Sequence, residues 1–190
     1  MHRLNAWLRR HPLVVDSAWA AIVLFVGLVP DDGSVEDGWR LKVSILIAVL
    51  LPLLMVFRRR HPDLTVAAAI GVGVGQVAAD VSPGGSAIAY LVFAYTGAAF
   101  GRKWTSWTAL AAGLSAGPLV FWQAEPVRTV IDAAGDAHTR PYGIGEATFL
   151  TLMMSTPFIL CWAWGRLTRV RRAYLTELED RAARLERERD

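Results

Sequence analysis

One carboxylate, Asp16, lies inside an apolar part of the sequence, and its chemistry constrains the fold. It comes one helical turn into the segment 13–29. A charged carboxylate in hydrocarbon is costly unless it is paired or faces water. Arg10, Arg59 and Arg102 flank apolar segments at the same predicted boundary. We therefore expect one of these arginines to form an ion pair with Asp16 that fixes the first helix.

The other reactive residue types do not form a recognisable site. A proton relay would need acids near the middle of the apolar segments, whereas Asp80 and Glu146 fall at the boundary opposite Asp16. The single cysteine, Cys161, excludes an intrachain disulfide and a zinc site built from cysteines. The glycine-rich run 71–75 lacks the lysine of a phosphate-binding loop. The sequence therefore predicts no catalytic, cofactor-binding or metal-ligating residue.

Small residues recur at helical spacing in two of the apolar segments. Such ridges let helix backbones approach each other closely. We expect both ridges to pack within one bundle, although the same pattern also serves contacts between two copies. The first ridge comprises Ala67, Gly71, Gly75 and Ala79, and the second comprises Ala109, Gly113 and Gly117.

The composition explains why the reactive residues are so few. Of the 190 residues, 54% are hydrophobic and 19% are charged, whereas a soluble domain carries about 25% charged residues. A helix needs about 20 apolar residues to cross a bilayer. Blocks of this kind without polar faces predict a membrane protein with several spans. They cover residues 13–29, 41–57, 64–80, 86–100, 104–122 and 145–165.

The expected fold is therefore all-α. Residues 1–165 are predicted to form a polytopic membrane bundle of about six transmembrane helices, and residues 166–190 a cytoplasmic coiled-coil helix that connects it to something further. The segment 86–100 is the shortest, and the sequence leaves open whether it crosses the membrane or re-enters. In the connection 123–144, a helical spacing of Val127, Val130, Ile131 and Ala134 predicts a short helix on the membrane surface.

The basic residues indicate the orientation of these spans. One set of connections carries twelve basic residues before the C-terminal tail, and the other carries only Arg40, Lys42, Arg128 and Arg140. By the positive-inside rule, both termini are predicted to be cytoplasmic, in the cell membrane. The string Arg-Arg-His-Pro occurs at 9–12 and again at 59–62. We interpret it, and with it Arg59 and Arg60, as a helix-boundary signal, because proline suits the first helical turn.

The last apolar segment carries two features suited to signalling. Pro157 falls near its middle, where it removes a backbone hydrogen bond and tends to bend the helix. Beyond it, apolar residues at steps of three and four form a coiled-coil seam, with charged residues around it. Two copies are therefore expected to pair as a homodimer through this helix. The seam comprises Leu175, Leu178, Ala182 and Leu185.

Four stretches in this order resemble the N-terminal membrane domain of actinobacterial sensor histidine kinases of the nitrate-sensor-like class. They are RRHPLVVD at 9–16, FRRRHPDLTVAAAIGVGVGQ at 57–76, AFGRKW at 99–104 and RAARLERERD at 181–190. The resemblance covers essentially the whole chain. It implies a sensory and anchoring input domain of a two-component phosphorelay. In that class, ATP, Mg²⁺ and the response regulator are bound by a kinase region that would follow this chain.

Two other functions remain open on the sequence. The first is a small transporter or channel, which is disfavoured because ionisable residues near the midplane and paired broken helices are not evident. The second is a free-standing integral membrane protein that acts through its cytoplasmic coil. The histidines do not stand in a phospho-acceptor context, and a nucleic-acid partner is not expected because the basic residues lie beside apolar blocks. The four histidines are His2, His11, His61 and His138.

Overall fold

The computed structural model of the chain describes residues 12–28, 38–81, 84–123, 127–131 and 137–189. Within these ranges there are six α-helices, which begin and end within a few residues of the six predicted segments, except that the last continues through the predicted connector helix 166–190. They are α2 (Pro12–Gly27), α3 (Gly38–Phe57), α4 (Pro62–Ala78), α5 (Ala87–Ala99), α6 (Lys103–Gln123) and α7 (Ile144–Arg189). A single 3-10 turn, η1 (Gly84–Ser86), leads into α5. The predicted helical class is confirmed.

The connection between α6 and α7 differs from the prediction. Instead of a surface helix, it forms an antiparallel hairpin of β1 (Val127–Ile131) and β2 (Ala137–Pro141). Val127 pairs with Pro141, and Ile131 pairs with Ala137. The spacing that suggested a helix is carried mainly by β-branched residues, whose stiff side chains favour strands. The prediction of a helix there was wrong because it relied on the helical spacing of these residues and neglected their preference for strands.

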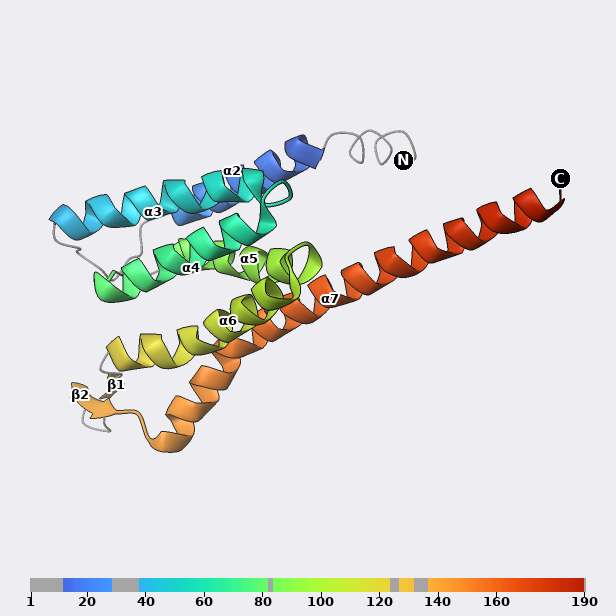
Figure 1. Cartoon of the computed structure of the whole chain (residues 1–190). Coiled ribbons are helices and arrows are strands. Elements are labelled where there is room, and N and C mark those ends of the chain that lie inside the picture. Colours follow the sequence, from blue (N-terminus) through green and yellow to red (C-terminus); the bar gives the residue numbers. More distant parts are fainter. Residues whose placement is uncertain (1–11, 29–37, 82–83, 124–126, 132–136, 190) are drawn as a thin grey trace.

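The helices run alternately up and down (Figure 1). We call one end of the bundle the arginine end. There α2, α4 and α6 begin, α3 and α5 finish, and α7 emerges as a long projecting rod. The opposite end carries the hairpin, and we call it the hairpin end. Arg58, Arg59, Arg60 and Arg102 all belong to the arginine end, in the turns after α3 and before α6.

Helix α5, the shortest of the six, is the centre of the bundle. It contacts each of the other five helices, and most of its residues from Ala89 to Ala99 are buried. Its 13 residues span about 20 Å, less than the roughly 30 Å of a hydrocarbon core. A helix enclosed by five others gains its stability from their side chains, so it does not need the length of a lipid-exposed helix.

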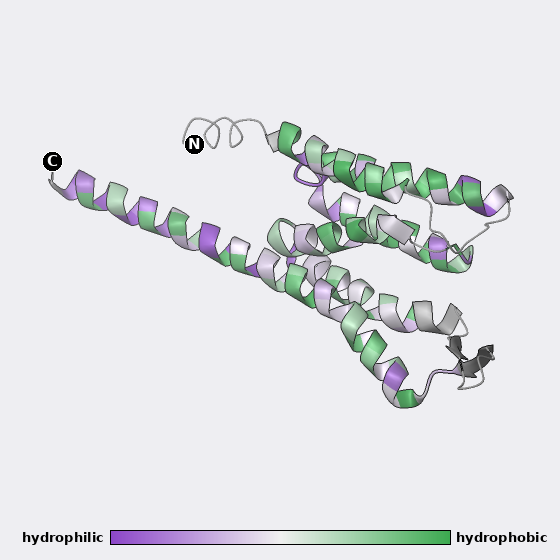
Figure 2. Ribbon diagram, turned by 180° about the vertical axis from the view of Figure 1, so that it is seen from behind, coloured by the Kyte–Doolittle hydropathy of each residue, from purple (hydrophilic) through white to green (hydrophobic). Residues whose placement is uncertain are grey.

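Large apolar side chains cover the outside of the bundle. Phe25, Leu64 and Phe149 are each more than 60% exposed. Figure 2 shows many hydrophobic residues along the bundle helices and a mixture of hydrophilic and hydrophobic residues along the projecting rod. A soluble monomer rarely exposes so continuous an apolar surface. Among the described residues, α3 and α7 are long and apolar enough to cross a membrane, and two shorter helices, α2 and α4, are also apolar. Such helices are compatible with a membrane location.

The two small-residue ridges have different environments. Gly113 and Gly117 on α6 face α7, because a Cβ atom added to Gly113 would lie 2.6 Å from Phe158. This ridge packs within the bundle as expected. In contrast, Ala67, Gly71 and Gly75 on α4 are exposed, and a Cβ atom on either glycine would meet nothing within 4 Å. The expectation that the first ridge packs inside the bundle was wrong, because spacing shows which residues share a face but not where that face points.

The tightest approach to α5 occurs at Gly165 of α7. A Cβ atom there would lie 2.6 Å from the Tyr95 carbonyl oxygen and 2.7 Å from the Ala98 Cβ atom. The carbonyl belongs to the backbone of a fully packed helix, so it cannot move aside as a side chain would. Gly165 therefore allows α7 to lie directly against α5.

We predict that Gly165→Ala lowers the free energy of unfolding by about 1–3 kcal/mol, the usual cost of overpacking a core. The matched control is Gly75→Ala on the open ridge of α4, which should leave stability unchanged or raise it by up to about 1 kcal/mol, since alanine favours a helix. Denaturant titration of both variants in mild detergent measures the difference. Equal stability of the two variants would contradict the packing of α7 on α5.

Candidate functional site

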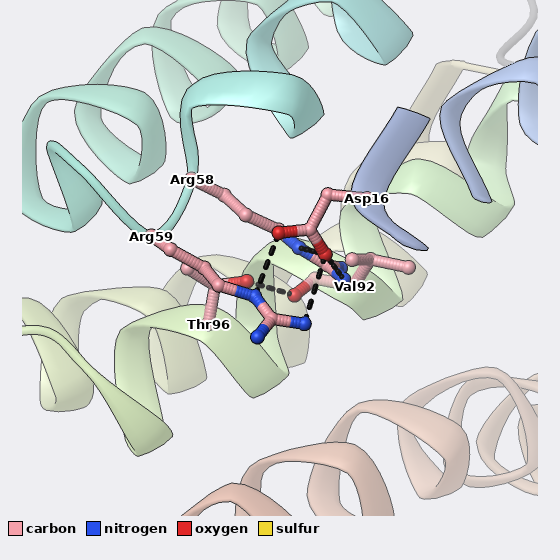
Figure 3. Close-up of polar contacts among 5 residues, drawn as sticks. All are labelled: Asp16, Arg58, Arg59, Val92 and Thr96. Carbon is pink, nitrogen blue, oxygen red and sulfur yellow. Dashed lines mark hydrogen bonds and ion pairs between the residues drawn. The ribbon is translucent and has the colours of Figure 1, made fainter. Parts of the chain in front are cut away.

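The arginine end holds a buried ion cluster centred on Asp16. The Asp16 side chain is 1% exposed, and its Oδ1 atom lies 2.5 Å from Arg58 Nη2 while its Oδ2 atom lies 2.6 Å from Arg59 Nε. Arg59 also donates from Nη2 to Oδ1 at 3.1 Å. Figure 3 shows both guanidinium groups converging on the carboxylate, beside the part of α5 that carries Val92 and Thr96. The cluster ties α2 to the turn between α3 and α4.

The predicted ion pair of Asp16 is therefore confirmed for Arg59, while the second partner, Arg58, was missed. Arg58 is buried because it extends the inward face of α3, on which Leu51 and Met55 are fully buried. The helical steps from Leu51 to Met55 to Arg58 were a usable signal for it. Arg60, the next residue, is exposed and takes no part in the cluster.

Arg102, another expected partner of Asp16, lies against a different carboxylate, while Arg10 falls outside the described residues. Asp63 Oδ1 accepts hydrogen bonds from the Arg102 backbone N–H at 2.9 Å and from Thr105 Oγ1 at 2.5 Å. The Thr105 and Arg102 hydrogen bonds hold the pKa of Asp63 below its usual value. Asp63 thereby joins the start of α4 to the turn between α5 and α6.

Arg169 anchors α7 where it leaves the bundle. Its guanidinium Nη2 donates to the Gly97 carbonyl at 3.3 Å and to the Gly101 carbonyl. The Gly97 carbonyl belongs to the last turn of α5, whose final carbonyls have no partners within the helix and attract a cation. Gly101 follows α5 by two residues. Burial, followed by repulsion from Arg166, lowers the pKa of Arg169, but an arginine keeps its charge in proteins.

Aromatic rings complete the packing of α7 at this end. Trp162 Nε1 donates to the carbonyl and hydroxyl oxygens of Ser106 on α6, at 2.9 and 3.0 Å. The Phe100 ring, just after α5, has the Arg172 guanidinium 4.6 Å from its centroid and that of Arg59 at 6.0 Å. Phe100 therefore lies between the Asp16 cluster and the exit of α7, so the two are neighbours in space.

The predicted signalling residues on α7 do not join this cluster. Pro157 is inside α7, which bends in its first part and then runs straight (Figure 1). Thr156 donates to the Leu152 carbonyl at 2.7 Å, next to the carbonyl of residue 153 that Pro157 leaves without its helical donor. Leu175, Leu178 and Leu185 are exposed on the projecting part. The expected continuity of the helix is confirmed, because α7 is unbroken from Ile144 to Arg189.

The two acids at the hairpin end have structural surroundings. Asp80, which follows α4 with a left-handed backbone angle φ of 52°, pairs with Arg40 at 3.2 Å. Glu146 accepts a hydrogen bond from the Gly143 backbone N–H at 3.2 Å and so caps the N-terminus of α7. Within the described residues, no group of three His, Cys, Asp or Glu side chains is placed to hold a metal ion.

The fold and this end of the bundle define a class: an apolar helical bundle whose last helix leaves the core as a rod. The chain belongs to a family described as a domain of unknown function, DUF7134, whose model matches residues 4–172. No curated protein and no solved structure matches the chain. The matched range contains the Asp16 cluster and the exit of α7, and the coiled-coil seam follows it.

We predict that Asp16→Asn destabilises the protein, because it leaves Arg58 buried without its counter-charge. Removing one partner of a buried pair costs about 3–5 kcal/mol. The yield of folded protein in mild detergent and its resistance to denaturant measure this loss. Arg60→Gln is the matched control, since it removes an exposed arginine from the same turn.

Asp16→Asn also separates structural from transport roles. An unchanged yield together with the loss of a proton or ion flux in reconstituted vesicles would contradict the structural role and favour a transporter.

Proposed function

We propose that this chain is the membrane-embedded sensory and anchoring input domain of a two-component sensor histidine kinase. The observation that carries the proposal is the single unbroken helix α7, which joins the core of the bundle to an exposed leucine seam. Its 46 residues span about 69 Å, about twice the thickness of a hydrocarbon core. A helix of this length can cross a membrane and still extend well beyond it.

In this proposal the six helices all cross the cell membrane, and the arginine end faces the cytoplasm. The exposed apolar surface of the bundle would contact lipid, and the arginines of the turns would lie at the anionic inner headgroups. The short helix α5 would be shielded from lipid by its neighbours, so its length would not need to match the bilayer. The hairpin would then lie on the outer side.

The seam supports a homodimer as the output state. Leu175, Leu178 and Leu185 are 48%, 41% and 62% exposed in one copy, which is the exposure expected of residues that pair with a second helix. Charged neighbours keep the rest of the rod soluble, including Arg181, which pairs with Glu177 at 2.5 Å. The small residue Ala182 weakens the seam and would keep two packings close in energy, as a switch requires.

In this proposal, residues 1–190 carry out none of the kinase chemistry. By the resemblance of the motifs at 9–16, 57–76, 99–104 and 181–190, a phospho-accepting helix and an ATP-binding domain would follow the coil. ATP, Mg²⁺ and the response regulator would be bound there. The residues of this chain would supply membrane anchoring, dimerisation and the transmission of a signal.

The topology has a direct test in a Cys161→Ser background. We expect Gly145→Cys, near the hairpin end, to react with a membrane-impermeant maleimide in intact cells. Glu179→Cys, on the rod, should react only after permeabilisation, because charged reagents do not cross the bilayer. The reverse pattern would overturn the orientation, and labelling of both positions in intact cells would overturn the membrane crossing of α7.

Transmission has a second test. Residues 1–190 are joined to a dimeric kinase core, and one to four residues are inserted after Arg172. If rotation passes along the coil, kinase output should rise and fall with roughly heptad phase. An insertion series in a fusion that lacks residues 12–123 serves as the control. A flat response to every insertion in the full chain would leave the domain as an anchor only.

A further inference from the structure

We propose that two copies of this chain contact each other along one continuous face of α7, which starts within the membrane bundle and runs into the seam. The proposal deepens the dimer of the proposed function and rests on it, because it adds a contact surface inside the membrane. We call this face the outer stripe. It comprises Leu160, Trp164, Leu167, Arg171, Leu175, Leu178, Ala182 and Leu185.

The outer stripe is regular and free of the chain's own side chains. Its members follow one another at steps of three and four, the spacing that keeps residues on one side of a helix. In the bundle part, Leu160, Trp164 and Leu167 are 64%, 67% and 62% exposed. The seam is therefore the end of a longer apolar face, which begins one turn after Pro157.

The opposite face of α7 is occupied by the chain's own bundle. Trp162 donates to Ser106, Gly165 lies against α5, and Arg169 donates to the Gly97 carbonyl in the last turn of α5. With about 100° of rotation per residue, these residues lie on the side of α7 roughly opposite the outer stripe. The bundle thus fixes the rotation of α7 and determines which face remains for a partner.

The continuity of α7 makes contact at the seam extend back to the bundle. Paired helices lie about 8–10 Å apart and cross at about 20° in coiled-coil packing. Leu167 precedes Leu175 by eight residues, or about 12 Å along the axis. Over that length two such helices diverge by about 4 Å, and α7 has no bend between these residues (Figure 1). Two copies joined at Leu175 must therefore also meet near Leu167, at the cytoplasmic boundary of the predicted membrane segment 145–165. The exposed Trp164 and Leu160 continue the same side of α7 into that segment.

Two features specify a second copy as the occupant of this face. The membrane part of the stripe lies on the same side of α7 as the seam, whereas the exposed ridge of α4 belongs to another helix and is not continuous with the seam. Arg171 is the only charged member, and it lies just after the basic residue Arg169 at the arginine end. A long arginine side chain extends its charge outward to the headgroups while its stem covers apolar surface, so one arginine at the boundary is compatible with a close pair.

Cysteine cross-linking of the full chain in membranes tests this surface. Single cysteines are placed at Leu160, Trp164, Leu167 and Leu175 in a Cys161→Ser background, and disulfides are formed with copper phenanthroline. We expect cross-linked dimer at all four positions above that from Val170→Cys, several-fold at Leu175 and Leu167 and less at Trp164 and Leu160, because the two helices diverge from the seam. Val170 is the matched control, since it is 60% exposed but lies off the stripe. All of these side chains are exposed, so the substitutions should not disturb folding.

The possible results separate this inference from the proposed function. Cross-linking at Leu175 alone would overturn the membrane contact and leave the dimer through the seam intact. An absence of cross-linking at all four positions would overturn both. Preferential cross-linking at Gly71→Cys or Gly75→Cys would show that the α4 ridge is the contact between copies, and would also overturn the proposal.

Discussion

The close packing of α7 on α5 is the contact on which the rest of the structure depends. The other five described helices all contact α5, so each of them is positioned against it. Gly165 brings the α7 backbone against Tyr95 and Ala98, and a larger residue would push the rod away from the core. Without this contact, α7 would be held to the bundle mainly by its packing on α6, and the direction in which the rod leaves the bundle would be less well defined.

Charges stabilise the same end of the bundle without forming a chemical site. Asp16 is paired with two arginines, and Asp63 accepts hydrogen bonds from the Thr105 hydroxyl and the Arg102 backbone N–H. A buried pair is weak evidence for stability by itself, because desolvation offsets the attraction. The two carboxylates instead determine how the helices are arranged at this end of the bundle. Asp16 joins α2 to the turn after α3, and Asp63 joins α4 to the turn before α6, so both fix the surroundings of the α5 terminus.

The sequence was sufficient to predict the helices, since apolar blocks of membrane-spanning length leave few alternatives. It also predicted the partner Arg59 and the unbroken course of α7. It was insufficient where the direction of a face decides the outcome. The ridge at Gly71 and Gly75 has the spacing of a packed surface, yet it points outward, because the position of a helix around α5 depends on all the other helices. Arg58 was missed for a related reason: its burial follows from the face of α3 that Leu51 and Met55 occupy.

The hairpin shows a different limit of sequence reasoning. Residues at helical spacing between 127 and 134 predicted a helix, but a strand partner at 137–141 was available a few residues further along the chain. Local periodicity does not reveal such a partner, whereas the β-branched composition of β1 favoured it. In a segment this short, the β-branched composition of β1 predicts its structure better than the spacing of its apolar residues does.

The division of α7 into two packed parts gives the arrangement its functional meaning. Before Pro157, α7 packs on α6, where Gly117 faces Thr151 and Ser155. After it, the helix still contacts α6 through Phe158 and Trp162, and it is also held to α5 by Gly165 and Arg169. A displacement at the hairpin end would thus reach the bend before it reached the arginine end. Whether the rod then turned or tilted would depend on the contacts of Arg169 and Arg172, because these polar contacts lie between the bend and the seam. Under the proposed function, the strength of these contacts sets how much of a movement in the membrane arrives at the coil.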